Sequence, residues 1–187
     1  MVCAEDVIGI YQRLCQNGIQ VWLTGGWGID ALLGEQTRPH KDLDVILLLD
    51  EVVRLRDILG GDGYVLKEIW SENRWVVDGE GIEIATAFVL QDAEGREVDV
   101  HAMQLDDQGN GVPTWEDNEG LIFKEQDLGG KGRIAGFAVQ CLSPEMQAVC
   151  HTGYEIPEKQ VRDLELLHEK YGVEYPDVYD RLGPAGS

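Results

Sequence analysis

The sequence has 187 residues, of which 43% are hydrophobic and 27% are charged, and its formal net charge is −20. This length and composition are those of one globular domain, or of one domain with a modest appendage. So acidic a chain repels nucleic acid and attracts metal ions or substrates that carry amines; a surface that is merely very soluble is the alternative.

The sequence contains no segment that predicts a membrane partner. No apolar run approaches the roughly 20 residues of a membrane-spanning helix. Met1 to Asp6 carries neither the basic nor the apolar region of a signal peptide. The cysteines form no CxxC pair, so neither a zinc site nor a disulfide framework is indicated. We therefore expect a cytoplasmic protein.

In the first third of the chain, the hydrophobic pattern alternates between helical spacing and short apolar runs. Helical spacing followed by Gly18 predicts a helix over 4–17. Further along, we expect a strand over 21–23, a helix over 27–33, a buried strand over 43–49 and a helix over 51–59 closed by Gly60 and Gly61.

From Tyr64 to Leu105 the pattern becomes that of β structure. Two strands over 82–90 and 97–105 flank Glu94-Gly95, which predicts a hairpin. The remainder is expected to comprise a loop over 106–120, a strand over 134–140, a helix capped by Ser143 with Pro144 at its first position, and a last helix that starts near Pro157. Strands in the middle with helices at both ends indicate an α+β fold.

Two carboxylates open the buried strand at Asp42-Leu43-Asp44. Because side chains alternate across a strand, Asp42 and Asp44 project from the same face. Burying two close carboxylates without a cation is costly, and oxygen ligands favour magnesium or manganese. A solvated strand end that carries two acids is the alternative.

A third acid lies between valines in Glu97-Val98-Asp99-Val100-His101, where Glu97, Asp99 and His101 share one face. If this strand lies beside the first, three carboxylates converge, as in phosphoryl transfer with two metal ions. Asp99 is then a metal ligand or the general base for an incoming hydroxyl. An edge strand with a polar outer face is the alternative.

Paired glycines, Gly25 and Gly26, join a strand to a helix. Such a junction lets the backbone approach a phosphate, and the helix N-terminus offers free N–H groups. Paired glycines also mark ordinary turns, so the order of the motifs carries more information than any one of them.

That order resembles the nucleotidyltransferase superfamily: Gly25-Gly26, then Asp42-x-Asp44 in a strand, then a single acid, Asp99. Within it, the segments 25–30 and 38–44 look like the small antibiotic nucleotidyltransferases, which modify lincosamides or the 2″-hydroxyl of aminoglycosides. The segments 99–101 and 151–154, and Asp163-Leu164, are closer to the lincosamide enzymes.

The resemblance implies a nucleotidyltransferase-type mixed β-sheet flanked by helices. It divides the chain into a core over 1–140, a small C-terminal helical part over 141–180 packed on that core, and a disordered tail over 181–187.

The resemblance also implies roles for individual residues. Asp42, Asp44 and Asp99 are the expected ligands of Mg²⁺ (or Mn²⁺), with Asp99 as base or shared ligand. Residues expected at the nucleoside triphosphate, for which ATP is favoured, are Gly25, Gly26, Arg38, His40 and Lys159, with Arg162 a further candidate. A surface role for Arg38 and a structural role for His40 and His101 are the alternatives.

The expected reaction transfers a nucleoside monophosphate to a hydroxyl of a small-molecule antibiotic and releases pyrophosphate. A lincosamide is the favoured acceptor. The β segment 78–95 is longer than in the lincosamide enzymes, which keeps an aminoglycoside as the alternative. A protein-modifying nucleotidyltransferase and a cation-binding protein without activity are the rival classes. No nucleic-acid partner is expected, and a homodimer is allowed.

Overall fold

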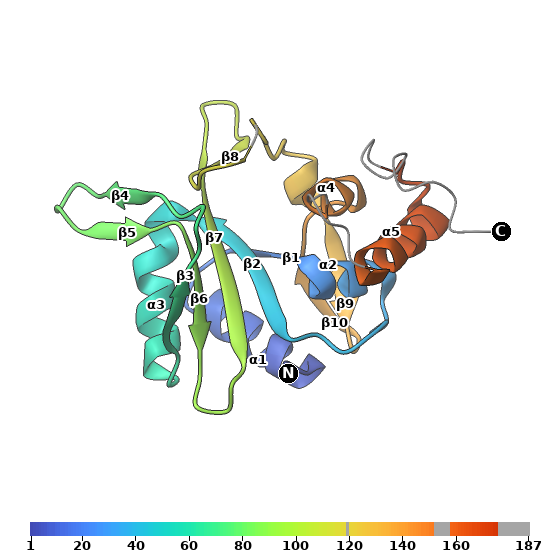
Figure 1. Cartoon of the computed structure of the whole chain (residues 1–187), viewed down its shortest axis with the longest axis horizontal. Coiled ribbons are helices and arrows are strands. Elements are labelled where there is room, and N and C mark those ends of the chain that lie inside the picture. The colour runs from blue at the N-terminus through green and yellow to red at the C-terminus, as the bar shows by residue number, and fades with distance from the viewer. Residues whose placement is uncertain (119, 152–157, 176–187) are drawn as a thin grey trace.

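The computed structural model describes residues 1–118, 120–151 and 158–175, and it shows an α+β fold built on a mixed β-sheet (Figure 1). Within these residues the α-helices are α1 (Ala4–Gln16), α2 (Gly25–Leu33), α3 (Val52–Gly61), α4 (Pro144–Cys150) and α5 (Glu158–Tyr171). None of the described helices is long and apolar enough to cross a membrane.

The central sheet has six strands in the order β1-β2-β7-β6-β3, with β8 added beside β7. Their bounds are β1 (Val21–Thr24), β2 (Asp42–Leu48), β3 (Val65–Ile69), β6 (Ala87–Gln91), β7 (Glu97–Leu105) and β8 (Gly111–Pro113). Strands β2 and β7 run parallel, and the other neighbours pair antiparallel.

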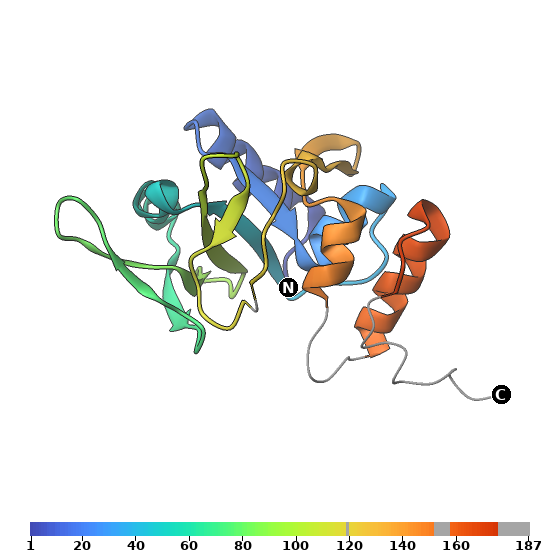
Figure 2. The same cartoon turned by 90° about the horizontal axis from the view of Figure 1, so that it is seen from above.

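Two hairpins stand outside this sheet. One joins β4 (Trp75–Val77) to β5 (Glu83–Ala85), and the other joins β9 (Lys131–Ile134) to β10 (Phe137–Gln140). The β4–β5 hairpin projects from one end of the molecule, while α2, α4 and α5 gather at the other end (Figures 1 and 2).

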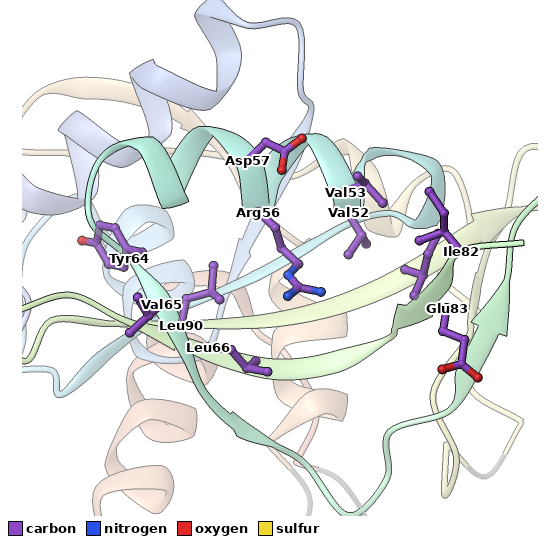
Figure 3. Close-up of a pocket in the computed structure, with 11 residues that line it drawn as sticks. Val52, Val53, Arg56, Asp57, Tyr64, Val65, Leu66, Ile82, Glu83 and Leu90 are labelled. Carbon is purple, nitrogen blue, oxygen red and sulfur yellow. The ribbon is translucent and has the colours of Figure 1, made fainter. Parts of the chain in front are cut away.

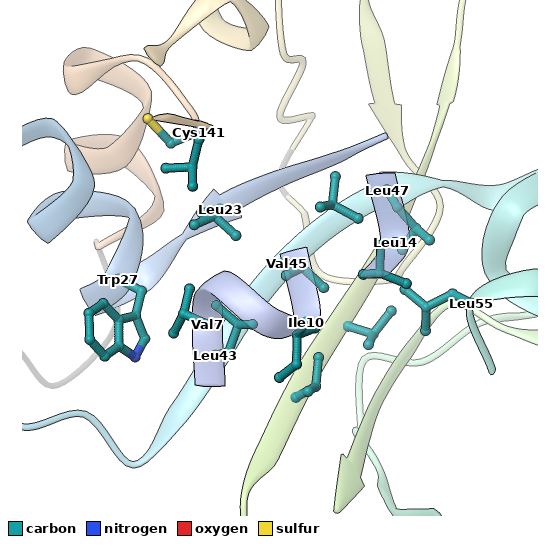
Figure 4. Close-up of a cluster of buried hydrophobic side chains, with 14 of the residues drawn as sticks. Val7, Ile10, Leu14, Leu23, Trp27, Leu43, Val45, Leu47, Leu55 and Cys141 are labelled. Atoms are coloured by element: carbon teal, nitrogen blue, oxygen red, sulfur yellow. The ribbon is translucent and has the colours of Figure 1, made fainter. Parts of the chain in front are cut away.

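One face of the sheet is covered by α1 and α3. The helical spacing expected for α1 places Val7, Ile10 and Leu14 on one side, and these side chains pack against Val45 and Leu47 of β2 (Figure 4). All are buried, because an apolar stripe at this spacing finds its partner in the apolar face of the sheet.

The opposite face of the sheet is covered only in part. Here Ile46 of β2 and Met103 of β7 form a second apolar cluster with Phe123, Leu128 and Met146. Side chains alternate along β2, so Asp42 and Asp44 share this second face with Ile46.

Most of the predicted elements are present, with differences at turns. Helix α2 starts at Gly25, two residues before the predicted start, and α3 continues through Gly60 and Gly61. The predicted loop over 106–120 contains the short strand β8.

Two predicted single strands are divided in the structure. The strand expected over 82–90 is interrupted at Thr86, and the one expected over 134–140 is two strands joined at Ala135 and Gly136. Both residues of that junction have positive φ, at 47° and 83°, which a continuous strand does not allow. The start of the last helix, predicted near Pro157, and the tail over 181–187 lie outside the described residues in whole or in part.

Candidate active site

Three carboxylates predicted to act together lie on neighbouring strands. Strands β2 and β7 are in parallel register, with Asp44 directly opposite Asp99 and Asp42 opposite Glu97. Asp42 and Asp44 are partly exposed, whereas Asp99 is 9% exposed. The alternative of an edge strand for Asp99 is wrong, because β7 is hydrogen-bonded to β2 on one side and to β6 on the other.

The first turn of α2 packs directly on the Asp44 carboxylate. Gly25 has φ of +60°, and a Cβ at this position would collide with the carboxylate of Asp44. Thr24, opposite Asp44 in the β1–β2 pair, precedes the helix but does not cap it with its side chain. The N-terminal turn of α2 therefore lies beside a carboxylate, and such a helix terminus can hold a phosphate when a cation bridges the phosphate and the carboxylate.

Gly26 lies against the side chains of His40 and Arg38. A Cβ at Gly26 would collide with the His40 imidazole and come within 3.1 Å of Arg38 Nη2. His40 is buried, its Nε2 is hydrogen-bonded to the carboxylate of Asp30, and its Nδ1 lies 3.0 Å from Arg38 Nη1. His40 thus supports Arg38 from behind the glycine turn.

Arg38 is held on its other side by Asp163 of α5. The guanidinium donates from Nε and Nη2 to the two oxygens of Asp163, at 3.3 and 2.6 Å. This hydrogen bonding raises the pKa of Arg38. The Asp163 side chain is buried while that of Arg38 is 26% exposed, so the guanidinium is anchored from the interior of the protein.

Asp99 contacts His101, which the sequence analysis placed on the same face of the strand, and Trp70, which it did not connect with Asp99. Trp70 Nε1 donates to Asp99 Oδ1 at 2.9 Å, and His101 Nδ1 lies 3.3 Å from the same oxygen. His101 Nε2 lies 3.6 Å from Glu72 Oε1. Burial alone would lower the pKa of His101, but the two carboxylates outweigh it and raise this pKa to about 9. The neighbouring imidazole lowers the pKa of Glu72 to about 2.

The sequence analysis also did not identify two lysines near Glu97, Lys41 just before β2 and Lys67 in β3. Lys41 and Lys67 contact the two oxygens of Glu97 at 2.9 and 2.6 Å. Burial alone would raise the pKa of Glu97, but the two lysines outweigh burial and lower this pKa. The sequence alone does not predict this pairing, because β6 lies between the strands that carry Lys67 and Glu97, and the contact depends on the order and register of those strands.

The C-terminal candidates are described only in part. The side chain of Lys159 and residues 152–154 lie outside the described residues. Arg162 is exposed and pairs with Glu165 at 3.0 Å. His151 is buried, with Nδ1 2.9 Å from the carbonyl oxygen of Gln147.

The donor set at Asp42, Asp44 and Asp99 consists of oxygen atoms, as magnesium prefers. Among residues 1–118, 120–151 and 158–175, no three Asp, Glu, His or Cys side chains form a ready-made metal cage. Magnesium is usually held by one or two carboxylates together with substrate phosphates, so an incomplete set of carboxylate ligands beside the N-terminus of α2 fits this ion.

A pocket of about 380 Å³ lies away from these carboxylates, between α3, β3 and the start of β5 (Figure 3). Its wall includes Leu90 and Val52, which belong to the apolar core on the α1 and α3 side of the sheet. It therefore contributes nothing to the carboxylate site.

Comparison with known proteins identifies relatives over most of the chain. Residues 6–167 match the family model described as aminoglycoside-2″-adenylyltransferase. The lincosamide resistance protein of Staphylococcus haemolyticus is 26% identical over 149 residues, which are 80% of this chain and 84% of that protein.

Two solved structures share the fold. The lincomycin-bound lincosamide antibiotic adenylyltransferase LnuA is similar with a TM-score of 0.71 and 24% identity, over 89% of this chain and 96% of that one. The enzyme ANT(2″)-Ia in complex with adenylyl-2″-tobramycin has a TM-score of 0.61 and 21% identity, over 89% and 87% of the two chains.

Proposed function

The chain belongs to the aminoglycoside-2″-adenylyltransferase family and is therefore an antibiotic nucleotidyltransferase, and we propose that it transfers AMP from ATP to a hydroxyl of a lincosamide with the help of magnesium. The observation that carries this proposal is the placement of Asp44 opposite Asp99 on parallel strands, with the first turn of α2 packed on Asp44. Carboxylates in contact with a helix N-terminus suit a metal-bound triphosphate.

In the proposed reaction the acceptor oxygen attacks the α-phosphorus of ATP in line with the leaving pyrophosphate. The bond from the α-phosphorus to the bridging oxygen breaks, and the electron pair leaves with pyrophosphate. Asp42 and Asp44 would hold magnesium, which would neutralise charge on the phosphates. Asp99 accepts the proton of the hydroxyl, or shares the metal while the proton passes to solvent.

The triphosphate is proposed to lie at the N-terminal turn of α2, where Gly25 and Gly26, which have no Cβ, leave room for the side chains of Asp44 and His40. Arg38, anchored by Asp163 and 26% exposed, is proposed to bind phosphate oxygens. His40 supports Arg38 rather than reaching the phosphate, since it is buried and hydrogen-bonded to Asp30. Lys159 stays a proposed phosphate ligand.

A lincosamide is the proposed acceptor because two observations favour it. The lincosamide resistance protein of Staphylococcus haemolyticus matches 80% of the chain, and the motifs 99–101 and 151–154 look like those of the lincosamide enzymes. An aminoglycoside is the second candidate, because the family model is named for it and a net charge of −20 favours a polycationic acceptor.

The other expectations from the sequence belong to the same proposal. They are a core over 1–140 with a C-terminal helical part over 141–180, a location in the cytoplasm, no nucleic-acid partner, and a homodimer as an assembly to test by light scattering. Modification of a protein acceptor ranks below both antibiotics.

Neutralising each carboxylate tests the site. We expect Asp42→Asn, Asp44→Asn and Asp99→Asn to lower the rate of AMP transfer by at least about 10²-fold, because each removes a charged oxygen from the metal or proton pathway. Pyrophosphate release in the presence of ATP, Mg²⁺ and acceptor measures this rate. Glu80→Gln, an exposed acid on the β4–β5 hairpin, is the matched control with unchanged rate.

Thermal unfolding of the same variants distinguishes loss of a reacting group from loss of fold stability. Removing one of the partly exposed acids Asp42 or Asp44 relieves repulsion between neighbouring carboxylates, so Tm should hold or rise. A fall of several degrees in both variants, with transfer retained, would indicate that these acids stabilise the fold and do not serve the reaction.

A further inference from the structure

Trp70 lies just beyond the end of β3, where the chain turns toward the β4–β5 hairpin (Figure 1). Its backbone N–H donates to the carbonyl of Ala87 at 3.1 Å, which extends the pairing with β6 by one residue. Its carbonyl accepts from the N–H of Asn73 at 3.1 Å and closes the turn. The backbone position of Trp70 is thereby fixed relative to the central strands.

A second set of hydrogen bonds ties the same turn to the start of β6. Asn73 Oδ1 accepts from the backbone N–H groups of Thr86 and Ala87, at 2.7 and 3.1 Å. Thr86 Oγ1 donates to the carbonyl of Arg74 at 2.9 Å and accepts from its N–H at 3.0 Å. The turn over 70–74 is thus anchored at its base, independently of the exposed tip of the hairpin.

The indole of Trp70 donates its single N–H on the face of the sheet that carries Asp44 and Asp99. This N–H donates to Oδ1 of Asp99 at 2.9 Å, and His101 Nδ1 lies 3.3 Å from that same oxygen. Among the hydrogen bonds formed within the described chain, none reaches Oδ2 of Asp99. One oxygen of the carboxylate is therefore held, and the other is left for the reaction.

We propose that Trp70 is a positioning residue, whose indole N–H fixes Oδ1 of Asp99 and so presents Oδ2 to the metal or to the acceptor hydroxyl. The proposal rests on the function proposed above for Asp99. A carboxylate held at one oxygen cannot rotate freely, and its second oxygen keeps one direction. Because indole is neutral and does not titrate, Trp70 adds no charge of its own beside Asp99.

Two other tryptophans of the chain, Trp22 and Trp75, allow this role to be distinguished from ordinary packing. Trp22 also uses its indole N–H, at 2.8 Å, but its partner is the backbone carbonyl of Leu128 in a buried cluster. Trp70 is only partly buried, and its partner is a carboxylate of the site. Trp75, on the hairpin, is 53% exposed. The three tryptophans form a matched set for substitution by Phe.

The kinetic test compares Trp70→Phe with Trp22→Phe and Trp75→Phe in the AMP transfer assay. We expect Trp70→Phe to lower kcat by about 10-fold to 100-fold, as loss of a group that orients a ligand does. The KM values for ATP and acceptor should stay within about twofold, since the lost contact orients a reacting group and binds neither substrate. Trp22→Phe should lower Tm without this fall in kcat, and Trp75→Phe should change neither.

A spectroscopic test needs no substrate or metal. Loss of one indole cross-peak in the ¹H–¹⁵N spectrum of Trp70→Phe assigns that signal. In Asp99→Ala, which keeps Trp70, the signal should shift and exchange faster with solvent, while the Trp22 signal stays in place. Where Trp70→Phe does not fold, nuclear Overhauser contacts from the indole N–H to neighbouring protons assign the signal in the wild-type protein instead, so this test stays informative.

The outcomes separate this inference from the proposed function. An unchanged kcat in folded Trp70→Phe, or an indole signal that does not respond to Asp99→Ala, would overturn the positioning role while transfer by the wild-type protein upholds the function. Absence of transfer by the wild-type protein would overturn the function, and the spectroscopic result would still decide whether the Trp70–Asp99 contact exists.

Discussion

Gly25 combines two requirements that only glycine meets. Its φ of +60° is unfavourable for residues with a Cβ, and that Cβ would occupy the space of the Asp44 carboxylate. The residue therefore determines both the entry into α2 and the position of a proposed metal ligand.

We expect Gly25→Ala to lower the free energy of unfolding by at least about 1–2 kcal/mol, the cost of the left-handed conformation, and to abolish most AMP transfer by displacing Asp44. Gly60→Ala is the matched control. Gly60 lies in α3, and a Cβ added there would meet nothing within 4 Å, so this change should stabilise the helix by about 0.5–1 kcal/mol. Urea unfolding and transfer rates measure both; equal behaviour of the two variants would remove the special role of Gly25.

Individual residues can be identified from the sequence where a charged side chain stands among apolar neighbours in the chain. Asp99 between valines and Asp42-Leu43-Asp44 at the start of an apolar strand could be predicted to lie on neighbouring strands, and Asp44 is opposite Asp99 in the β2–β7 pair. Trp70 could not be connected with Asp99, because the contact depends on strand order and on the turn after β3. Nor could Asp163 be matched to Arg38 from a distance of 125 residues along the chain.

Among the elements, α5 connects the C-terminal part of the chain to the proposed nucleotide site. Asp163 holds Arg38 in the connection between α2 and β2. Near its other end, Lys170 Nζ donates to the carbonyls of Leu32 and Leu33, at 3.1 and 2.6 Å, and so satisfies the C-terminal carbonyls of α2. Helix α5 thereby contacts the C-terminal end of α2 and Arg38, which follows that helix in the chain.

We expect Asp163→Asn to lower the free energy of unfolding by about 1.5–3 kcal/mol, the value of hydrogen bonds to a charged group, because the Asp163 carboxylate is buried. The KM for ATP should rise more than the KM for the acceptor, since Arg38 loses its anchor. Glu165→Gln, on the same helix and paired with Arg162 at the surface, is the control. A rise confined to the acceptor KM would place Arg38 at the acceptor and not at the triphosphate.

The elements themselves could be predicted where hydrophobic periodicity is long. Helix α1 and strand β2 match their predicted ranges within a residue. The short strands β8, β9 and β10 could not be resolved, because three or four residues carry too little pattern and their ends depend on residues such as Ala135 in left-handed conformation. These differences in strand boundaries do not involve β2 or β7, which carry Asp42, Asp44 and Asp99.

For the whole molecule, a net charge of −20 makes the binding of free ATP unfavourable. We expect ATP to raise Tm only when Mg²⁺ or Mn²⁺ is present, because the metal ion must bridge the triphosphate and the carboxylates. At 100 times Kd, binding should stabilise the folded protein by about 2.7 kcal/mol. Equal stabilisation by ATP in excess EDTA would contradict the assigned site, and Asp44→Asn should abolish the metal-dependent gain.

The same charge bears on the acceptor. Exposed acids far from the site contribute little to affinity at physiological salt, where attraction is screened beyond about 8 Å. An aminoglycoside carries several positive charges, so its KM should climb steeply between low and physiological ionic strength. A lincosamide carries at most one, and its KM should stay nearly constant.

The most direct test incubates the purified protein with ATP, Mg²⁺ and either lincomycin or tobramycin, and follows pyrophosphate release together with the mass of the antibiotic. Lincomycin is predicted to gain one adenylyl group at a rate that salt hardly changes. Adenylylation of tobramycin alone would replace the acceptor and leave the enzyme class intact. If neither antibiotic gains mass while ATP and Mg²⁺ bind, transfer to an antibiotic hydroxyl is contradicted.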